Sequence, residues 1–149
     1  MTGHVLILDD QVRHIADIQA TKSDDNQYFF VTNPYSALYL LLEYDVDHDL
    51  DLIACNVNLR GGDVSQFIKQ VKADRQLSTI PVVCYCVTSD LALESIRSVA
   101  ETLGVDELIA SSTFDAETIC HEIDHLVEPG SRVTPPFEFG GAEDFSANN

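Results

Sequence analysis

Short apolar runs alternate with helix-type patterns along most of the chain, and this alternation limits the fold more than any other feature. Five runs have the composition of strands buried on both faces: residues 5–8, 28–32, 52–55, 80–87 and 107–110. A segment with helical spacing follows each run, within about 125 residues. Buried strands joined by helices pair in parallel through right-handed crossovers. We therefore predict an α/β fold, a doubly wound five-stranded parallel sheet flanked by five helices.

The helical patterns also predict which side chains face the sheet. The expected inward residues are, helix by helix, Val12, Ile15 and Ala16; Ala37, Leu38, Leu41 and Leu42; Val64, Phe67, Ile68 and Val71; Ala92, Ile96, Val99, Ala100 and Leu103; and Ala116, Ile119, Ile123 and Leu126. Asn33 before Pro34 is typical of a helix start, and the last helix should begin near Asp115. Gly104 is placed to end the fourth helix.

The composition changes after residue 127. Pro135-Pro136 and Gly140-Gly141 lie in a stretch that has no apolar periodicity. Such segments are typical of linkers and disordered tails. We therefore predict one domain over residues 1–127 and a linker or tail over residues 128–149.

The charge balance excludes some partners. The chain has 25 acidic and 8 basic residues, a net charge of −17, so we expect this domain to bind neither nucleic acid nor an anionic membrane surface. The excess is typical of an adaptation to solubility or high salt, and an alternative is a docking surface for basic partners. No apolar run reaches 18 residues, and residues 1–4 lack signal-peptide character, so we expect a cytoplasmic, reduced protein.

Open parallel sheets bind ligands beyond the carboxyl ends of their strands. In this chain the residues at those ends are Asp9 and Asp10, residues 56–58, residues 86–89 and residues 110–112. These positions are the candidate site.

Four segments resemble the receiver domains of two-component response regulators: residues 5–10, 51–63, 80–83 and 104–108. The resemblance spans residues 4–127, and the ungapped middle segment is its most specific part. It implies a flavodoxin-like sheet with strand order 2-1-3-4-5. In that family an aspartate at the end of the third strand accepts a phosphoryl group, with Mg²⁺ held by the acidic pair, that aspartate and a backbone carbonyl two residues later.

Three positions depart from the family pattern. The acceptor position holds Asn56, whose amide is not a nucleophile and is a poorer Mg²⁺ ligand than a carboxylate. The Thr/Ser position holds Cys86, a weak hydrogen-bond donor, and the lysine position falls at Ser111. We interpret these three residues as a degenerate phosphorylation site.

Two further positions also differ: the expected proline falls at Ser112 and the switch aromatic at Leu108. The acidic pair Asp9-Asp10 is retained, and the carbonyl position falls at Asn58. By the resemblance these three residues are the metal candidates, with weak Mg²⁺ as the one cofactor to test. Alternatively, the two carboxylates cap backbone amides or face solvent.

The cysteines, the paired histidines and the first strand end do not indicate a catalytic site. Cys55, Cys84 and Cys86 lie in apolar strand-like runs, where free thiols are usually buried. Their spacing is not that of a zinc site. His121 and His125 match the letters of a His-Glu-x-x-His motif but have no third ligand in evidence, so an exposed polar face is the default. Gln11 argues against a haloacid-dehalogenase-type phosphatase, and Asp9-Asp10 would repel a flavin phosphate. We therefore predict that the chain is not an enzyme.

The resulting functional hypothesis is a phosphorylation-independent regulatory module, a pseudo-receiver that acts through protein contacts. The resemblance places its partner face on the fourth helix, fifth strand and fifth helix, around residues 90–103 and 115–127, for another protein or a second copy of the chain. Two alternatives stay open. The chain is a weakly Mg²⁺-binding receiver with residual response to small phosphodonors, or it is the N-terminal regulatory domain of a larger regulator.

Overall fold

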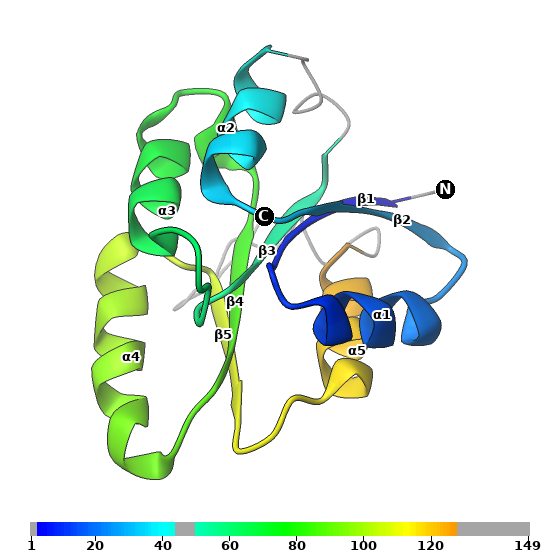
Figure 1. The fold of residues 1–149 in the computed structure, drawn as a ribbon. Helices are drawn as coiled ribbons and strands as arrows, with labels where there is room; N and C mark the ends of the chain where they lie inside the picture. The colour runs from blue at the N-terminus through cyan, green and yellow to red at the C-terminus, as the bar shows by residue number, and fades with distance from the viewer. Residues whose placement is uncertain (1–2, 44–49, 128–149) are drawn as a thin grey trace, which may run out of the picture.

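A computed structural model describes residues 3–43 and 50–127, and it has the predicted α/β architecture. Five parallel strands form one sheet in the order β2-β1-β3-β4-β5, as predicted (Figure 1). The strands are β1 (Gly3–Leu8), β2 (Asn26–Val31), β3 (Leu52–Asn56), β4 (Val82–Val87) and β5 (Glu107–Ser111). The helices are α1 (Val12–Thr21), α2 (Pro34–Glu43), α3 (Val64–Ala73), α4 (Asp90–Leu103) and α5 (Ala116–Val127), and a 3-10 turn lies at Leu77–Thr79.

Helices cover both faces of the sheet. Helices α1 and α5 lie on one face, and α2, α3 and α4 lie on the other (Figure 1). Alternate residues of each central strand enter opposite cores, because successive side chains of a strand point to opposite faces. In β1, for example, Leu6 and Leu8 belong to the core beneath α2 and α3, and Val5 and Ile7 belong to the core beneath α1 and α5.

The predicted helix ends are confirmed where the local chemistry is specific. The Oδ1 atom of Asn33 accepts a hydrogen bond from the amide of Ser36 at 2.9 Å, which caps the start of α2. Asp115 caps α5 in the same way through the amide of Thr118. Gly104 ends α4 with a φ of 84°, a conformation that favours glycine.

Strand β4 is shorter than predicted, because it begins at Val82 rather than at residue 80. Pro81 has no N–H to donate to a neighbouring strand. Its carbonyl accepts a hydrogen bond from the amide of Ile53 at 3.0 Å, and Ile80 closes the preceding 3-10 turn.

Three predicted helix faces are wrong in part. Helix α1 buries His14 and Ile18, while Val12 is 81% exposed. Leu42 of α2 and Val99 of α4 are also exposed, by 53% and 52%. Apolar spacing describes a stripe on a helix but not the width of the neighbouring structure that covers it, and α2 and α4 both present more apolar surface than their neighbours cover.

The predicted linker or tail, residues 128–149, lies outside the described residues. None of the helices in residues 3–43 and 50–127 combines the length and the apolar character needed to cross a bilayer.

Candidate functional site

The candidate site lies where β1, β3 and β4 end. Asp9 and Asp10 directly follow β1, and Asn56 is the last residue of β3. Tyr85 of β4 is the register partner of Asn56. Since the three strands are parallel neighbours, their carboxyl ends bring these side chains together at one edge of the sheet.

Asp9 is fully buried, and each of its carboxylate oxygens has two hydrogen-bond partners. Oδ1 accepts from the backbone amide of Gln11 and from Nδ2 of Asn56, both at 3.0 Å. Oδ2 accepts from the hydroxyl of Tyr85 at 2.7 Å and lies 2.9 Å from Nδ1 of His14. The His14 tautomer with its hydrogen on Nδ1 donates to that oxygen. Four donors from α1, β3, β4 and the β1–α1 loop therefore satisfy a carboxylate that would be costly to bury alone.

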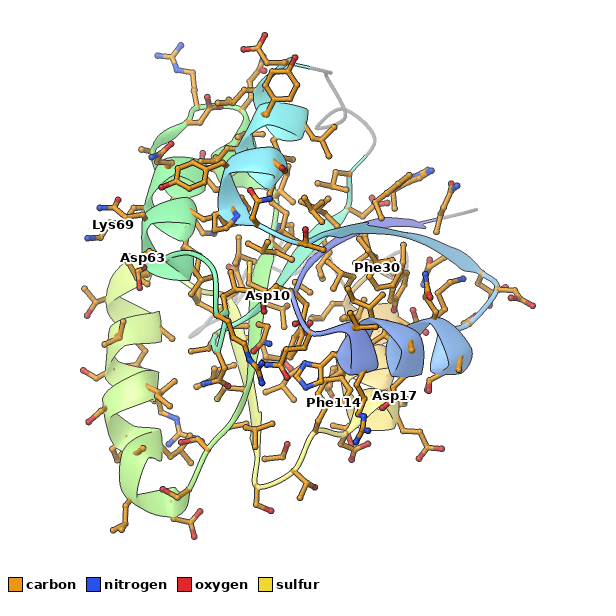
Figure 2. All side chains as sticks on the ribbon, in the orientation of Figure 1. Asp10, Asp17, Phe30, Asp63, Lys69 and Phe114 are labelled. Atoms are coloured by element: carbon orange, nitrogen blue, oxygen red, sulfur yellow. The ribbon has the colours of Figure 1, made fainter. Side chains whose placement is uncertain are left out.

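An aromatic side chain covers this hydrogen-bonded group. The ring of Phe114 stacks on that of His14 with a centroid separation of 3.8 Å and an angle of 6° between the planes. The same ring lies 6.1 Å from that of Tyr85, at 58°. Figure 2 shows Phe114 beside the start of α1. Burial, and secondarily the charge of Asp9, raise the pKa of Tyr85 well above its usual value, so its hydroxyl keeps its proton and donates.

Asp10 has a different role from Asp9. Its Oδ2 atom accepts hydrogen bonds from the amides of Arg60 and Gly61, at 2.8 and 2.9 Å, and so holds the β3–α3 loop against the end of β1. Figure 2 places Asp10 near the middle of the molecule. The acidic pair therefore caps backbone amides, and Asp9 does not face solvent.

The orientation of Asn56 follows from the bonds at both ends of its amide group. Nδ2 donates to Asp9, and Oδ1 accepts from the backbone amide of Asn58 at 2.8 Å. Asn58 in turn accepts a hydrogen bond from the amide of Val87 at 3.2 Å through its side-chain Oδ1. Asn56 is 1% exposed, so its amide acts as an internal hydrogen-bond donor to Asp9.

Within the described residues, neither Cys86 nor Ser111 makes a hydrogen bond to the group around Asp9. Cys86 is buried on β4, on the face opposite Tyr85, and burial raises the pKa of its thiol. The hydroxyl of Ser111 donates to the carbonyl of Thr113 at 2.6 Å, within its own loop. Ser111 and Ser112 line a separate cavity of about 280 Å³ with Thr88, Ser89 and Asp90.

The hydrogen bonds around Asp9 and Asn56 leave no place for a Mg²⁺ ion between these two side chains. Each oxygen of Asp9 already accepts hydrogen bonds from two protein donors. Asn56 and Tyr85 point N–H and O–H groups towards the carboxylate, whereas a Mg²⁺ ion at that place would need oxygen lone pairs. Within the described ranges, no group of three or more His, Cys, Asp or Glu side chains is arranged to hold a metal. One oxygen is left over: Oδ1 of Asp10 is buried and has no hydrogen-bond partner.

The cysteines and histidines lie where a structural explanation accounts for them. Cys55 and Cys84 are register partners on β3 and β4, both buried and reduced, and a mutual hydrogen bond and burial raise the pKa of Cys55. His121 and His125 lie on the exposed side of α5.

Sequence reasoning missed the roles of His14 and Tyr85. The available signal for Tyr85 was its place in β4 one residue before Cys86, which puts it beside Asn56 once the register is known. His14 follows Asp9 by five residues, a spacing that places it in the first turn of α1. Neither signal shows that the two side chains converge on Asp9.

Sequence comparison identifies no relative of this chain: no protein-family model matches it, and no curated protein matches it. Comparison of structures does. The phosphorylated cyanobacterial phytochrome response regulator RcpA matches with a TM-score of 0.71 at 21% identity, covering 85% of this chain and 94% of RcpA. The chemotaxis response regulator CheY4 of Vibrio cholerae matches with a TM-score of 0.69 at 17% identity, covering 85% and 99%. The Mn²⁺-bound form of response regulator Rcp1 matches with a TM-score of 0.64 at 16% identity, covering 83% and 91%.

Together, the strand order and these matches define a flavodoxin-like α/β protein. More narrowly, the chain has the fold of response-regulator receiver domains. At these identities the likeness establishes the fold and not the activity.

Proposed function

We propose that the chain is a signalling module with a receiver fold that works without phosphorylation and acts through contacts with other proteins. The main observation behind this proposal is the hydrogen bonding of Asn56. A side chain that donates to Asp9 replaces the nucleophile that the fold family uses, and its amide is held at both ends.

The surroundings of Asn56 support the same reading. In the family pattern a lysine and a Thr or Ser would bind the phosphoryl group, but here Ser111 is engaged in its own loop and Cys86 is a weak donor. Tyr85 and His14 both hydrogen-bond Oδ2 of Asp9, so a phosphoryl group would approach a pocket in which protein groups already hold this oxygen.

The direct test is a titration of the isotope-labelled chain with acetyl phosphate or beryllofluoride and Mg²⁺, followed by NMR and intact mass. We expect no added mass and no saturable shift at Asn56, Asp10 or Cys86. An Asn56→Asp variant measured in parallel shows how much of the family's chemistry one side chain restores. Saturable shifts around Asn56 in the unmodified chain would contradict the proposal.

One observation favours a second candidate, the weakly Mg²⁺-binding receiver. The unpartnered Oδ1 of Asp10 is a hard oxygen ligand at the pocket edge. If it binds Mg²⁺, the melting temperature rises with millimolar Mg²⁺ and the rise disappears in Asp10→Asn. No rise in the unmodified chain excludes this candidate.

For the partner surface we propose the α4–β5–α5 face. Leu93 of α4 lines a cavity with Ala110 and Ser111 of β5, and all five residues of β5 are half-buried. Partner capture from the native cell by the unmodified chain and by Leu93→Glu tests this surface, and we expect the variant to lose the captured protein. Undiminished capture by the variant would remove this face from the proposal.

A further inference from the structure

Helix α2 lacks charged residues over most of its length, which is unusual in this chain. Residues 34–42 have none, and Glu43 is the first, in a chain with 25 acidic residues and a net charge of −17. A helix that is apolar on all sides is normally buried. Here the buried residues of α2 are Pro34, Ala37 and Leu41.

The remaining large side chains of α2 form a single exposed stripe. Tyr35, Tyr39 and Leu42 are 80%, 55% and 53% exposed, at spacings of four and three residues. Residues at these spacings lie on one side of a helix, and the rise from Tyr35 to Leu42 is about 10 Å. We call these three residues the α2 stripe. Tyrosine is among the side chains that a protein contact buries to most effect, and Leu42 extends the apolar strip beside the two tyrosines.

The charge pattern separates the α2 stripe from other exposed apolar residues. Leu91 is 95% exposed, but it lies on α4 beside Asp90, and the residues three and four positions after it, Glu94 and Ser95, are polar. Two copies of a chain with 17 excess negative charges repel one another over most of their surfaces. They approach without opposing carboxylates where both surfaces are uncharged, and the α2 stripe is such a surface.

The ends of α2 have opposite electrostatic character. Glu43 lies at its C-terminal end, and the N-terminal end has the positive end of the helix dipole. The β3–α3 loop, which carries the exposed Arg60, lies against that N-terminal end: a Cβ atom on Gly62 would be 2.6 Å from Cδ of Pro34. In an antiparallel pair of α2 helices, Glu43 of each copy would therefore face the N-terminal end and Arg60 of the other. In a parallel pair, Glu43 would face Glu43.

We propose that the α2 stripe is a self-association surface, and that its occupant is the α2 stripe of a second copy packed antiparallel about a two-fold axis. A two-fold contact needs a patch that is complementary to itself, which an uncharged stripe with opposite ends provides. The proposal does not depend on the proposed function, because it concerns a different face from α4–β5–α5. The stripe is small compared with the roughly 800 Å² that each partner buries in a stable interface, so the dimer is weak, with a dissociation constant of about 10–100 μM.

The test is sedimentation velocity of the full chain from about 1 to 500 μM, a range that brackets a dimer of this strength. The unmodified chain approaches twice the monomer mass at the upper end, and more readily at high salt, which screens the repulsion between copies. Tyr35→Glu weakens association at least about tenfold, because a carboxylate then opposes its copy in an apolar contact. Circular dichroism checks that this variant, whose substituted side chain is exposed, stays folded.

Leu91→Glu is the matched control, since it adds the same charge at an exposed leucine on another helix, and it leaves the dimer unchanged. Tyr39→Cys tests the geometry of the contact. Residue 39 lies near the predicted two-fold axis, so two copies of this variant form a disulfide with each other under mild oxidation. Two copies of the Leu91→Cys control do not. A monomer at every concentration, or loss of the dimer in Leu91→Glu but not in Tyr35→Glu, would overturn the proposal.

Discussion

The centre of the sheet and its β5 edge differ in how completely they are packed. All residues of β3, and residues 5–8 of β1, are buried, and the hydrogen-bonded group around Asp9 extends this interior to the strand ends. At the β5 edge, all five residues of β5 are half-buried, and Ala100 is the one buried residue of the fourteen in α4.

The two regions therefore differ in how easily they can change conformation. In the centre, Asp9, His14, Asn56 and Tyr85 form a closed group whose donors and acceptors satisfy one another. Few buried apolar contacts generally mean a lower free energy of local opening. We therefore expect signals to pass through α4 and β5, and the centre to act as a rigid base.

The largest effect should come from Asn56→Asp at pH 7 without Mg²⁺. The substitution places a second carboxylate about 3.0 Å from Asp9 in a buried position. We expect a loss of about 3 kcal/mol in the free energy of unfolding, measured by urea denaturation, with partial recovery as acidification protonates the pair. Asn33→Asp is the control, because aspartate caps a helix as well as asparagine does, and it should change stability by less than about 0.5 kcal/mol. A variant as stable as the unmodified chain would mean that the centre is not closed.

Tyr85→Phe should have the next largest effect. It removes the 2.7 Å hydrogen bond to Asp9 and leaves that carboxylate buried with one donor fewer. We expect a loss of about 2 kcal/mol. Tyr28→Phe removes a 3.1 Å hydrogen bond to the partly buried Asp124 and should cost less, about 1 kcal/mol. Equal losses in the two variants would show that the hydrogen bond to Asp9 contributes no more to stability than the one to Asp124.

A smaller effect, dependent on pH, is expected at the β5–α5 contact. Burial, and then the hydrogen bond and charge of Glu122, raise the pKa of Glu107 from 4.5 to about 7. The folded chain therefore holds this proton more tightly than the unfolded chain does. The resulting stabilisation is present at low pH, declines as the pH rises from 4.5 towards 7, and is absent above that range.

Glu107→Gln should remove this decline, and it should raise stability above pH 7 by up to about 1 kcal/mol, a value reduced for solvent screening because the side chain is partly exposed. Melting curves from pH 4 to 8 test the variant, with Glu94→Gln on the exposed side of α4 as the control. A pH profile that is the same in Glu107→Gln and the unmodified chain would contradict the assignment.

The smallest effect is expected on α4 itself. Leu91→Ala changes a side chain that is 95% exposed, so the free energy of unfolding should change by less than about 0.5 kcal/mol. A loss above about 1.5 kcal/mol would mean that α4 is packed more tightly than the comparison between the centre and the β5 edge implies.

Much of the fold could be predicted from the residues alone. Five buried-type runs and their intervening helical patterns predicted the parallel sheet, and local chemistry predicted helix ends at Asn33, Gly104 and Asp115. These features depend on near neighbours in the chain, so short-range patterns suffice. The candidate position Asn56 could also be found, because the end of a strand is visible in the sequence.

The environment of Asn56 was decided by the tertiary structure. Asp9 and Tyr85 are 76 residues apart, and their hydrogen bond depends on the register of β3 with β4. The burial of His14 and the exposure of Val12 depend on how α1 lies against the sheet, and the exposed α2 stripe depends on how far the neighbouring structure extends. The sequence by itself determined the parallel α/β sheet and the presence of an asparagine, Asn56, at the end of its third strand. Only the tertiary structure decided that internal donors fill the pocket, because the groups that meet there come from separate strands and helices.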